Sequence, residues 1–187
     1  AYPAFTIREN TVRLLHVIPS TNPVAGGPIE GINRRGAYLR MAGHEVEIVS
    51  LDPPGCEFLS STVLPVHALG PGLGKYGYHP RLVPWLREHT HVYDAVIVNG
   101  IWQYHSFATW RAMAGSSVPY FVFTHGMLDP WFKKNYPFKH LKKWLYWPWS
   151  EYRVLRDAAA VIYTCEEERI LARQSFWLYR CNERVMS

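Results

Sequence analysis

The sequence predicts an α/β fold of three layers, in which helices cover both faces of a mostly parallel β-sheet. Short segments rich in apolar and β-branched residues alternate along the chain with segments whose apolar residues recur at helical spacing. The strand segments are apolar on both faces, which is typical of strands buried in a parallel sheet. The chain has 187 residues, of which 48% are hydrophobic, so residues 1–187 can bury one core as a single domain.

The predicted strands share apolar, β-branched or aromatic residues and end at Pro, Gly or polar residues. They are residues 11–18, 46–51, 63–69, 94–99, 120–124 and 159–163. Because Pro65 cannot donate a hydrogen bond to a neighbouring strand, we place the third of these strands near an edge of the sheet.

The predicted helices are recognised by their apolar spacing and by the residues that begin or end them. They are residues 29–39, 81–89, 104–114, 141–156 and 166–174. Gly43 is suited to ending the first helix, and Pro148 interrupts the fourth. Thr164 and Glu167 have the spacing of a capping box for the last helix. The acidic residues 166–168 then offset the helix dipole, which is a structural role.

Composition excludes several classes of protein. No run approaches the roughly 18 consecutive apolar residues of a membrane-spanning helix. The first residues lack a basic segment followed by an apolar one, so we expect no signal peptide. Cys56, Cys165 and Cys181 have no metal-ligand spacing, so we expect free thiols in a reducing cytosol and no metal site.

The positive charge is concentrated in one aromatic segment. The net charge is +5, and residues 131–156 carry five Lys, two Arg and nine aromatic residues against a single Glu. Such a segment suits an anionic membrane or the wall of a ligand-binding site, and nucleic acid offers similar electrostatics. A buried aromatic face with solvated lysines is an equal alternative. The residues concerned are Lys133, Lys134, Lys139, Lys142, Lys143, Trp144 and Trp147.

Parallel sheets bind ligands at the carboxyl ends of their strands, so the loops that follow the strands are the candidate site. After the first strand, Gly26 and Gly27 let a ligand approach the backbone, and the start of the next helix favours a phosphate or a sugar oxygen. A tight turn from strand to helix is the structural alternative, and position alone does not separate the two.

Two further loops carry polar and aromatic side chains. Asn99, Gln103 and His105 can bind hydroxyl groups, and Trp102 offers a flat face to a sugar ring, although its loop can also pack into the core. After the fifth strand, His125 can bind a hydroxyl group or take a proton near pH 7. Asp129 follows as an acidic partner.

The string from Gly72 to Gly77 matches the G-x-G-x-x-G pattern of nucleotide-binding oxidoreductases. However, Tyr78, His79 and Pro80 follow it instead of a helix, and it comes after the third strand. We therefore interpret it as a mobile glycine-rich loop and expect no nicotinamide binding.

The motifs together resemble the N-terminal half of a bacterial family 4 glycosyltransferase with the GT-B fold, over residues 12–184. The resemblance depends on Gly26-Gly27, on residues 43–46 and 94–102, and above all on residues 124–131 (THGMLDPW). It implies a Rossmann-like domain and a retaining transfer of a sugar, of hexosyltransferase type, from a nucleotide-sugar to a polysaccharide or lipid-linked acceptor. The nucleotide-sugar is then a substrate, so no cofactor is expected.

The resemblance also assigns roles to residues. It implies that Gly26 and Gly27 approach the donor diphosphate and the acceptor, and that His125 lies at the reaction centre. Family members often carry a His where this chain has Asn99. These residues do not include the C-terminal domain that binds the nucleotide-sugar in the family. We expect this partner domain to be a missing C-terminal GT-B domain or to be supplied by a separate chain. The domain alone is then expected to be inactive.

The alternative function is a non-catalytic module that binds a glycan or lipid or docks another chain. In the enzyme interpretation, the family implies polysaccharide biosynthesis in the cytoplasm, with the protein peripheral on the inner face of the membrane. We expect no nucleic-acid partner, because the basic segment is the sole feature that favours one.

Overall fold

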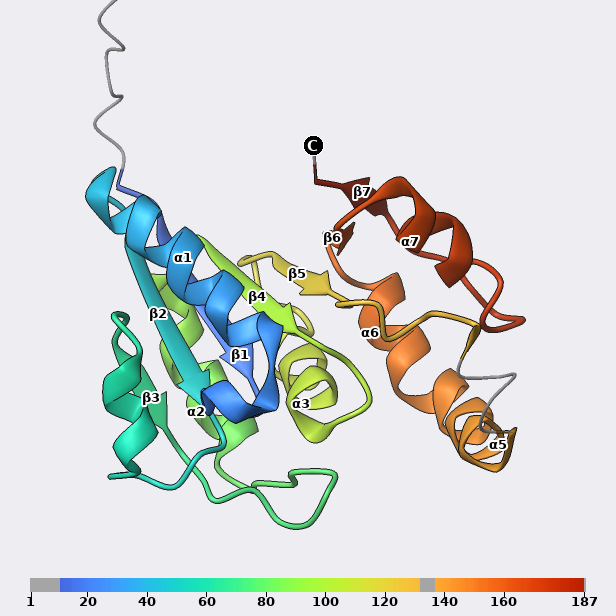
Figure 1. The fold of residues 1–187 in the computed structure, drawn as a ribbon, viewed down its shortest axis with the longest axis horizontal. Helices are drawn as coiled ribbons and strands as arrows, with labels where there is room; N and C mark the ends of the chain where they lie inside the picture. Colours follow the sequence, from blue (N-terminus) through green and yellow to red (C-terminus); the bar gives the residue numbers. More distant parts are fainter. Residues whose placement is uncertain (1–10, 132–136, 187) are drawn as a thin grey trace, which may run out of the picture.

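The computed structural model describes residues 11–131 and 137–186, and its central feature is a sheet of seven parallel strands in the order β3-β2-β1-β4-β5-β6-β7 (Figure 1). The predicted α/β class with a parallel sheet is therefore confirmed. The strands are β1 (Arg13–Ile18), β2 (Glu45–Ser50), β3 (Val66–Ala68), β4 (Ala95–Asn99), β5 (Tyr120–Phe123), β6 (Ala160–Tyr163) and β7 (Glu183–Val185). The short strand β7 was not predicted.

The strands pair in parallel at the centre of the sheet, and the predicted edge strand lies at an edge. Leu14 of β1 pairs with Val46 of β2 on one side and with Ala95 of β4 on the other. The strand after Pro65 lies at the edge, as predicted, and the Pro65 carbonyl accepts the Ile48 N–H at 2.9 Å. The chain leaves β1 towards β2 on one side and later returns to β4 on the other, so the carboxyl end of β1 is a switch point where such sheets bind ligands.

The helices begin and end close to the predicted residues. They are α1 (Gly27–Met41), α2 (Leu82–His89), α3 (Tyr104–Met113), α5 (Pro137–Tyr146), α6 (Glu151–Arg156) and α7 (Glu166–Ala172). Short 3₁₀ turns are Pro23–Ala25, Glu57–Ser61, Thr90–Val92 and Trp147–Trp149. The last of these turns contains Pro148 and separates α5 from α6, because proline cannot continue the hydrogen-bond ladder of an α-helix.

Two groups of buried apolar side chains cover the two faces of the sheet. The larger group packs β1, β4, β5 and β6 against α2, α3 and α6, with Leu15, Val98, Val122 and Leu155 almost fully buried. The smaller group packs α1 onto β1 and β2 through residues such as Ile32 and Ile48. The start of α1 thereby lies at the carboxyl edge of the sheet, next to the ends of β1 and β4.

The predicted capping box at the start of α7 is wrong in one partner. The N–H and the hydroxyl of Thr164 both donate to Glu168, each at 2.7 Å, and the residue that caps the helix is Cys165. Glu168 lies one residue beyond the predicted Glu167 and three residues after the cap Cys165, and its other oxygen makes contacts outside the helix.

Candidate functional site

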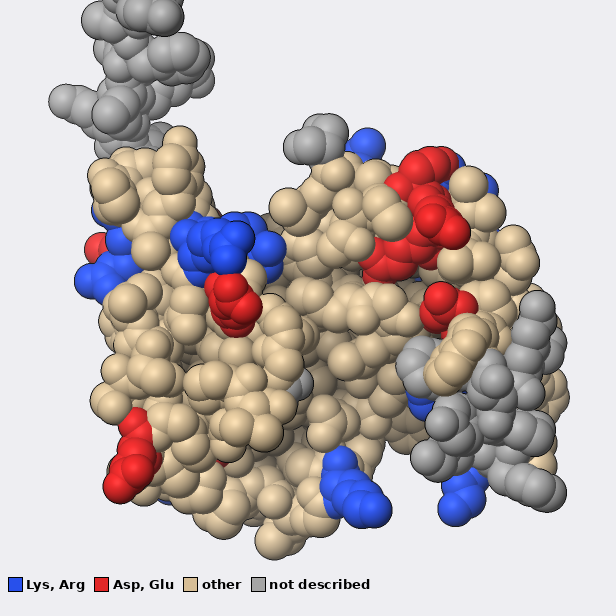
Figure 2. Space-filling model, in the orientation of Figure 1, with Lys and Arg blue, Asp and Glu red and all other residues tan. Residues whose placement is uncertain are grey.

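A pocket of about 620 Å³ opens at the carboxyl edge of the sheet. Figure 2 shows that the molecule is hollowed between α1 and the part of the chain that carries α7, with basic side chains over α1 and acidic ones over α7. The start of α1, the loop after β5 and the start of α7 all contribute to the pocket. Its lining residues are Gly27, Pro28, His125, Gly126, Asp129, Thr164, Cys165, Glu167, Glu168 and Leu171.

The two glycines after β1 differ in their relation to the pocket, because Gly27 lines it and Gly26 does not. Gly26 caps α1 with φ +102°, a backbone conformation that side chains disfavour, and its N–H donates to the Pro23 carbonyl at 3.1 Å. Gly27 begins α1 and lines the pocket, and no heavy atom lies within 4 Å of where its Cβ would be. A ligand can therefore approach the first turn of α1, whose N–H groups favour negative charge.

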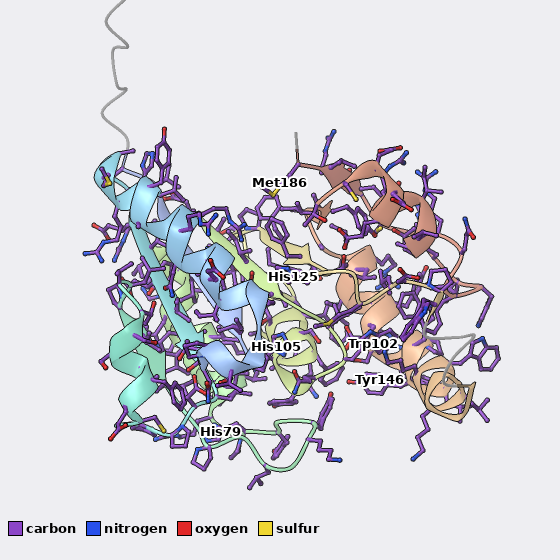
Figure 3. The ribbon with its side chains drawn as sticks, viewed as in Figure 1. His79, Trp102, His105, His125, Tyr146 and Met186 are labelled. Carbon is purple, nitrogen blue, oxygen red and sulfur yellow. The ribbon has the colours of Figure 1, made fainter. Side chains whose placement is uncertain are left out.

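His125 enters the pocket from the end of β5 in a strained backbone conformation, with φ +49° (Figure 3). Its ring stacks on Phe123 at 5.6 Å between centroids, and its Nε2 is buried with no hydrogen-bond partner among the described residues. Burial lowers the pKa of His125, and the nearby charge of Arg35 lowers it further. The imidazole is consequently neutral at pH 7 and can accept or donate one hydrogen bond.

Glu168 holds this strained loop in place. One oxygen, Oε1, accepts the Thr124 hydroxyl at 2.7 Å and the Gly126 N–H at 2.8 Å, and Oε2 accepts both donors of Thr164. Burial by itself raises the pKa of Glu168, but the hydrogen bonds from Thr164, Thr124 and Gly126 outweigh it, and the pKa is lowered. The sequence interpretation assigned Glu168 only to the helix dipole. Glu168 and Gly126 are 42 positions apart in the sequence, so no local pattern could have predicted their hydrogen bond.

The loop after β4 is fastened to the loop after β5. Trp102 has φ +75°, and its N–H donates to Oε1 of the fully buried Glu151 at 3.0 Å. The Trp102 indole N–H donates to the Met127 carbonyl at 3.1 Å, and the Ile101 N–H points to the Met127 sulfur at 3.3 Å. The position of the His125 loop therefore depends on Glu151, which lies on another helix.

Two predicted ligands in the β4 loop are buried and do not line the pocket. The Asn99 side chain is 2% exposed, and its amide donates to His16 Nδ1 at 3.1 Å. His105 is 0% exposed, and its Nε2 lies 2.9 Å from the Asn99 carbonyl and 3.1 Å from that of Gly100. The Asn99 side chain thereby ties β4 to β1, and His105 braces the turn after β4, so a contact with substrate would require them to leave these positions.

The remaining predicted ligands lie at or near the pocket. Asp129 lines it, and its carboxylate accepts the Trp131 N–H at 2.7 Å. Gln103 is partly exposed and donates to the Lys75 carbonyl at 3.2 Å, which joins the β4 loop to the glycine-rich loop. The structure thus brings Gly27, His125 and Asp129 together and places Gln103 and Trp102 on the adjoining loop.

Comparison with known proteins decides the family. The model of the glycosyl transferase 4-like domain matches residues 26–183. The chain belongs to this family. A search of curated proteins finds no match to this glycosyltransferase-family chain.

Solved glycosyltransferases share the fold of this family member. HepE from Anabaena, solved in complex with UDP and glucose, is 18% identical with a TM-score of 0.59, over 94% of this chain and 44% of its own. A glycosyltransferase from Rickettsia africae is 15% identical with a TM-score of 0.57, and the match covers 95% of this chain and 43% of the Rickettsia protein. MurG from Acinetobacter baumannii is 11% identical with a TM-score of 0.51, and the match covers 95% of this chain and 45% of MurG. The chain has the Rossmann-like fold of one half of a GT-B enzyme and spans less than half the length of these proteins.

The basic-aromatic segment of this glycosyltransferase domain divides between surface and core. Lys133, Lys134 and the side chain of Lys139 lie outside the described residues. Lys142 and Trp144 are exposed, whereas the Lys143 ammonium lies 4.5 Å from the centre of the Trp102 ring. Trp147 is 0% exposed and stacks on Phe176 at 4.2 Å, so its predicted place on the surface patch is wrong.

Other sequence features of the glycosyltransferase domain have structural outcomes. The glycine-rich loop closes on itself through the Leu73–Tyr78 bridge, and α2 begins only at Leu82, so no helix start follows the glycines. In the part of the chain that the structure describes, no three His, Cys, Asp or Glu residues cluster closely enough to bind a metal ion. Within the same residues, every helix is too short or too polar to cross a membrane.

Proposed function

We propose that this domain is the acceptor-binding half of a retaining glycosyltransferase of hexosyltransferase type. It would transfer a sugar from a nucleotide-sugar to a polysaccharide or lipid-linked acceptor in polysaccharide biosynthesis. The observation that carries the proposal is the pocket that joins the open first turn of α1, a neutral His125 and the carboxylate of Asp129 at the carboxyl edge of the sheet. HepE, whose fold this chain shares, was solved with UDP and glucose.

The pocket suits the two substrates of such a reaction. A diphosphate is anionic, and the N–H groups at the start of α1 are placed to bind it where Gly27 has no side chain. His125 can orient a hydroxyl group or the transferred sugar through its unpartnered Nε2. Asp129 and Gln103 are then available to the acceptor, whereas the ring of Trp102 is covered by the Lys143 ammonium and packs beside Phe176. A second domain, on the same or a separate chain, supplies the remaining donor contacts, so we expect the domain alone to transfer no sugar.

The experiment is an assay of sugar transfer with a panel of nucleotide-sugars, using a polypeptide that unites this domain with its nucleotide-binding half. We expect Gly27→Val, which fills the approach to the first turn of α1, and His125→Asn each to lower the rate by roughly 100-fold or more. Ala37→Val, further along the same helix, is the matched control and leaves the rate unchanged. Acceptor binding with no transfer from any donor would overturn the proposal and favour a docking module that binds a glycan or lipid.

We further propose a cytoplasmic location for the domain, on the inner face of a membrane, with α5 as the contact. Leu141, Trp144 and Leu145 recur at helical spacing, and their side chains are 55%, 42% and 61% exposed. Trp177 lies beside Trp144, with ring centroids 6.2 Å apart, and is also exposed. Exposed Trp and Leu beside Lys142 suit a surface of anionic lipid, because the indoles can enter the headgroup layer while the ammonium meets phosphate.

A further inference from the structure

Arg35 lies on the face of α1 that borders the candidate site. Its Cζ lies 5.2 Å from the centre of the Phe123 ring, and Phe123 is the last residue of β5. His125 stacks on the same ring. The ring of Phe123, at the carboxyl edge of the sheet, therefore contacts both the guanidinium and the imidazole.

The charge of Arg35 has no counter-ion among the residues that the structure describes. Other arginines, such as Arg34, Arg156 and Arg173, are each paired with a carboxylate. Arg35 makes no such ion pair in the described parts of the chain, and its Nη2 is buried with no hydrogen-bond partner there. Burial lowers the pKa of Arg35. A buried guanidinium nitrogen in this state requires a partner that the described residues do not supply.

Gly31 leaves room for the Arg35 guanidinium to lie back along α1, in the direction of Gly27. A Cβ at Gly31 would lie 3.2 Å from Nη1 and 3.4 Å from Nη2 of Arg35, so the side chain extends back over this glycine. Gly27, Gly31 and Arg35 follow one another at four-residue steps and therefore share one face of α1. Gly31 is one step, about 6 Å, from Gly27 and the phosphate-favouring first turn.

We propose that Arg35, which lies beside this pocket and does not line it, binds a phosphate group of the substrate together with the first turn of α1 and His125. The inference rests on the proposed function, because that function requires a substrate that carries a phosphate. A guanidinium presents paired N–H donors that match phosphate oxygens, which explains an unpaired arginine beside an anion-favouring helix start. The phosphate belongs either to the nucleotide-sugar donor or to a lipid-linked acceptor, and the two share this chemistry.

The pKa of the neighbouring His125 makes the binding measurable. The positive charge of Arg35 lowers the pKa of His125, after the larger effect of burial. An anion bound to Arg35 offsets that charge, so it should raise the pKa of His125. This readout depends on phosphate binding and requires no sugar transfer.

The experiment follows the imidazole of His125 by NMR during titration with inorganic pyrophosphate, UDP, a short-chain alkyl phosphate and uridine. We expect the phosphorylated probes, but not uridine, to raise the pKa of His125. Stronger binding of UDP than of the alkyl phosphate assigns the site to the donor, and the reverse order assigns it to the acceptor. The inference is overturned if no phosphorylated probe moves this pKa.

Variants separate a binding role from a structural one. Arg35→Met keeps an unbranched stem over Phe123, and we expect it to weaken pyrophosphate binding by about 10- to 100-fold. Arg34→Met removes the adjacent, exposed arginine and should leave binding unchanged. Gly31→Ala raises helix propensity, so it should fold, yet its methyl group lies 3.2 Å from Nη1 and must shift the guanidinium by a few tenths of an ångström, which should weaken binding. Wild-type affinity in Gly31→Ala and Arg35→Met would overturn the inference even if the enzyme transfers sugar. Intact phosphate binding without transfer would instead count against the proposed function alone.

Discussion

The Gly126 N–H donates to Oε1 of Glu168 at 2.8 Å, and the two residues are 42 positions apart in the chain. This hydrogen bond ties the residue that follows His125 to the first turn of α7. Since His125 has φ +49°, its loop requires such external support to keep a conformation that L-residues disfavour. The orientation of the candidate reactive residue is therefore decided by a helix near the end of the chain.

Replacing Glu168 should destabilise the domain in a pH-dependent way. The lowered pKa of Glu168 means that its ionised form stabilises the fold above pH 4.5, and that this contribution is lost as pH falls through the lower folded pKa. We expect Glu168→Gln to lose about 1–3 kcal/mol at pH 7 and less at pH 3, measured by urea unfolding. Glu167→Gln, an exposed neighbour on the same pocket, is the control and should behave as wild type. Equal losses at both pH values would contradict an ionic role for Glu168.

The buried Glu151 should have the opposite effect on stability. Burial raises the pKa of Glu151 to about 7, against hydrogen bonds from Ser106 and Trp102 that lower it. A carboxyl group whose folded pKa is raised binds its proton more tightly in the native state, so stability falls as pH rises from about 4.5 to 7. We expect Glu151→Gln to gain stability over wild type as pH rises through this window, by roughly 3 kcal/mol in the limit, because the amide cannot ionise.

The exposed Glu88 provides the comparison for Glu151. Glu88→Gln should leave the slope of unfolding free energy against pH unchanged between pH 4.5 and 7. If Glu151→Gln also leaves that slope unchanged, the carboxyl group of Glu151 titrates normally and its burial has been relieved.

Buried histidines should make the domain sensitive to acid. Burial lowers the pKa of His105 to about 4, below the ordinary value of 6.5. The unfolded state then binds the proton more readily, so stability is lost as pH falls from 6.5 towards 4. We expect His105→Gln, whose amide can still donate to the carbonyl groups of Asn99 and Gly100, to reduce this loss in thermal unfolding. His91→Gln, at an exposed position, should not reduce it.

The proposed membrane surface on α5 predicts sedimentation with anionic vesicles at low salt. Each lysine near such a surface contributes about 1 kcal/mol, so Lys142→Glu should weaken binding by roughly 10-fold or more. Trp144→Ala should weaken it through lost burial of the indole. Arg34→Glu changes charge equally on α1, away from α5, and should have little effect. Absence of binding to anionic vesicles at low salt would mean that this face is a wall of the acceptor site.

Local sequence patterns were sufficient for the order of the elements and for the edge position of β3. Apolar segments indicate which strands are buried, and Pro65 lacks the N–H that a central strand would need. The order of the elements and the edge position of β3 therefore follow from a few neighbouring residues. The same holds for the break at Pro148 between α5 and α6. Gly27 and His125 could be placed at the candidate site because strand ends in a parallel sheet share one edge.

Only the tertiary structure decided which polar groups meet. Glu168 reaches Gly126, Glu151 holds Trp102, and Arg35 lies over Phe123 without a described carboxylate partner. Trp147 is buried while Trp144 is exposed, although both belong to one aromatic segment. Local propensity determines the course of the backbone. The burial and partners of a side chain depend on elements that are distant in sequence and meet only when the sheet assembles.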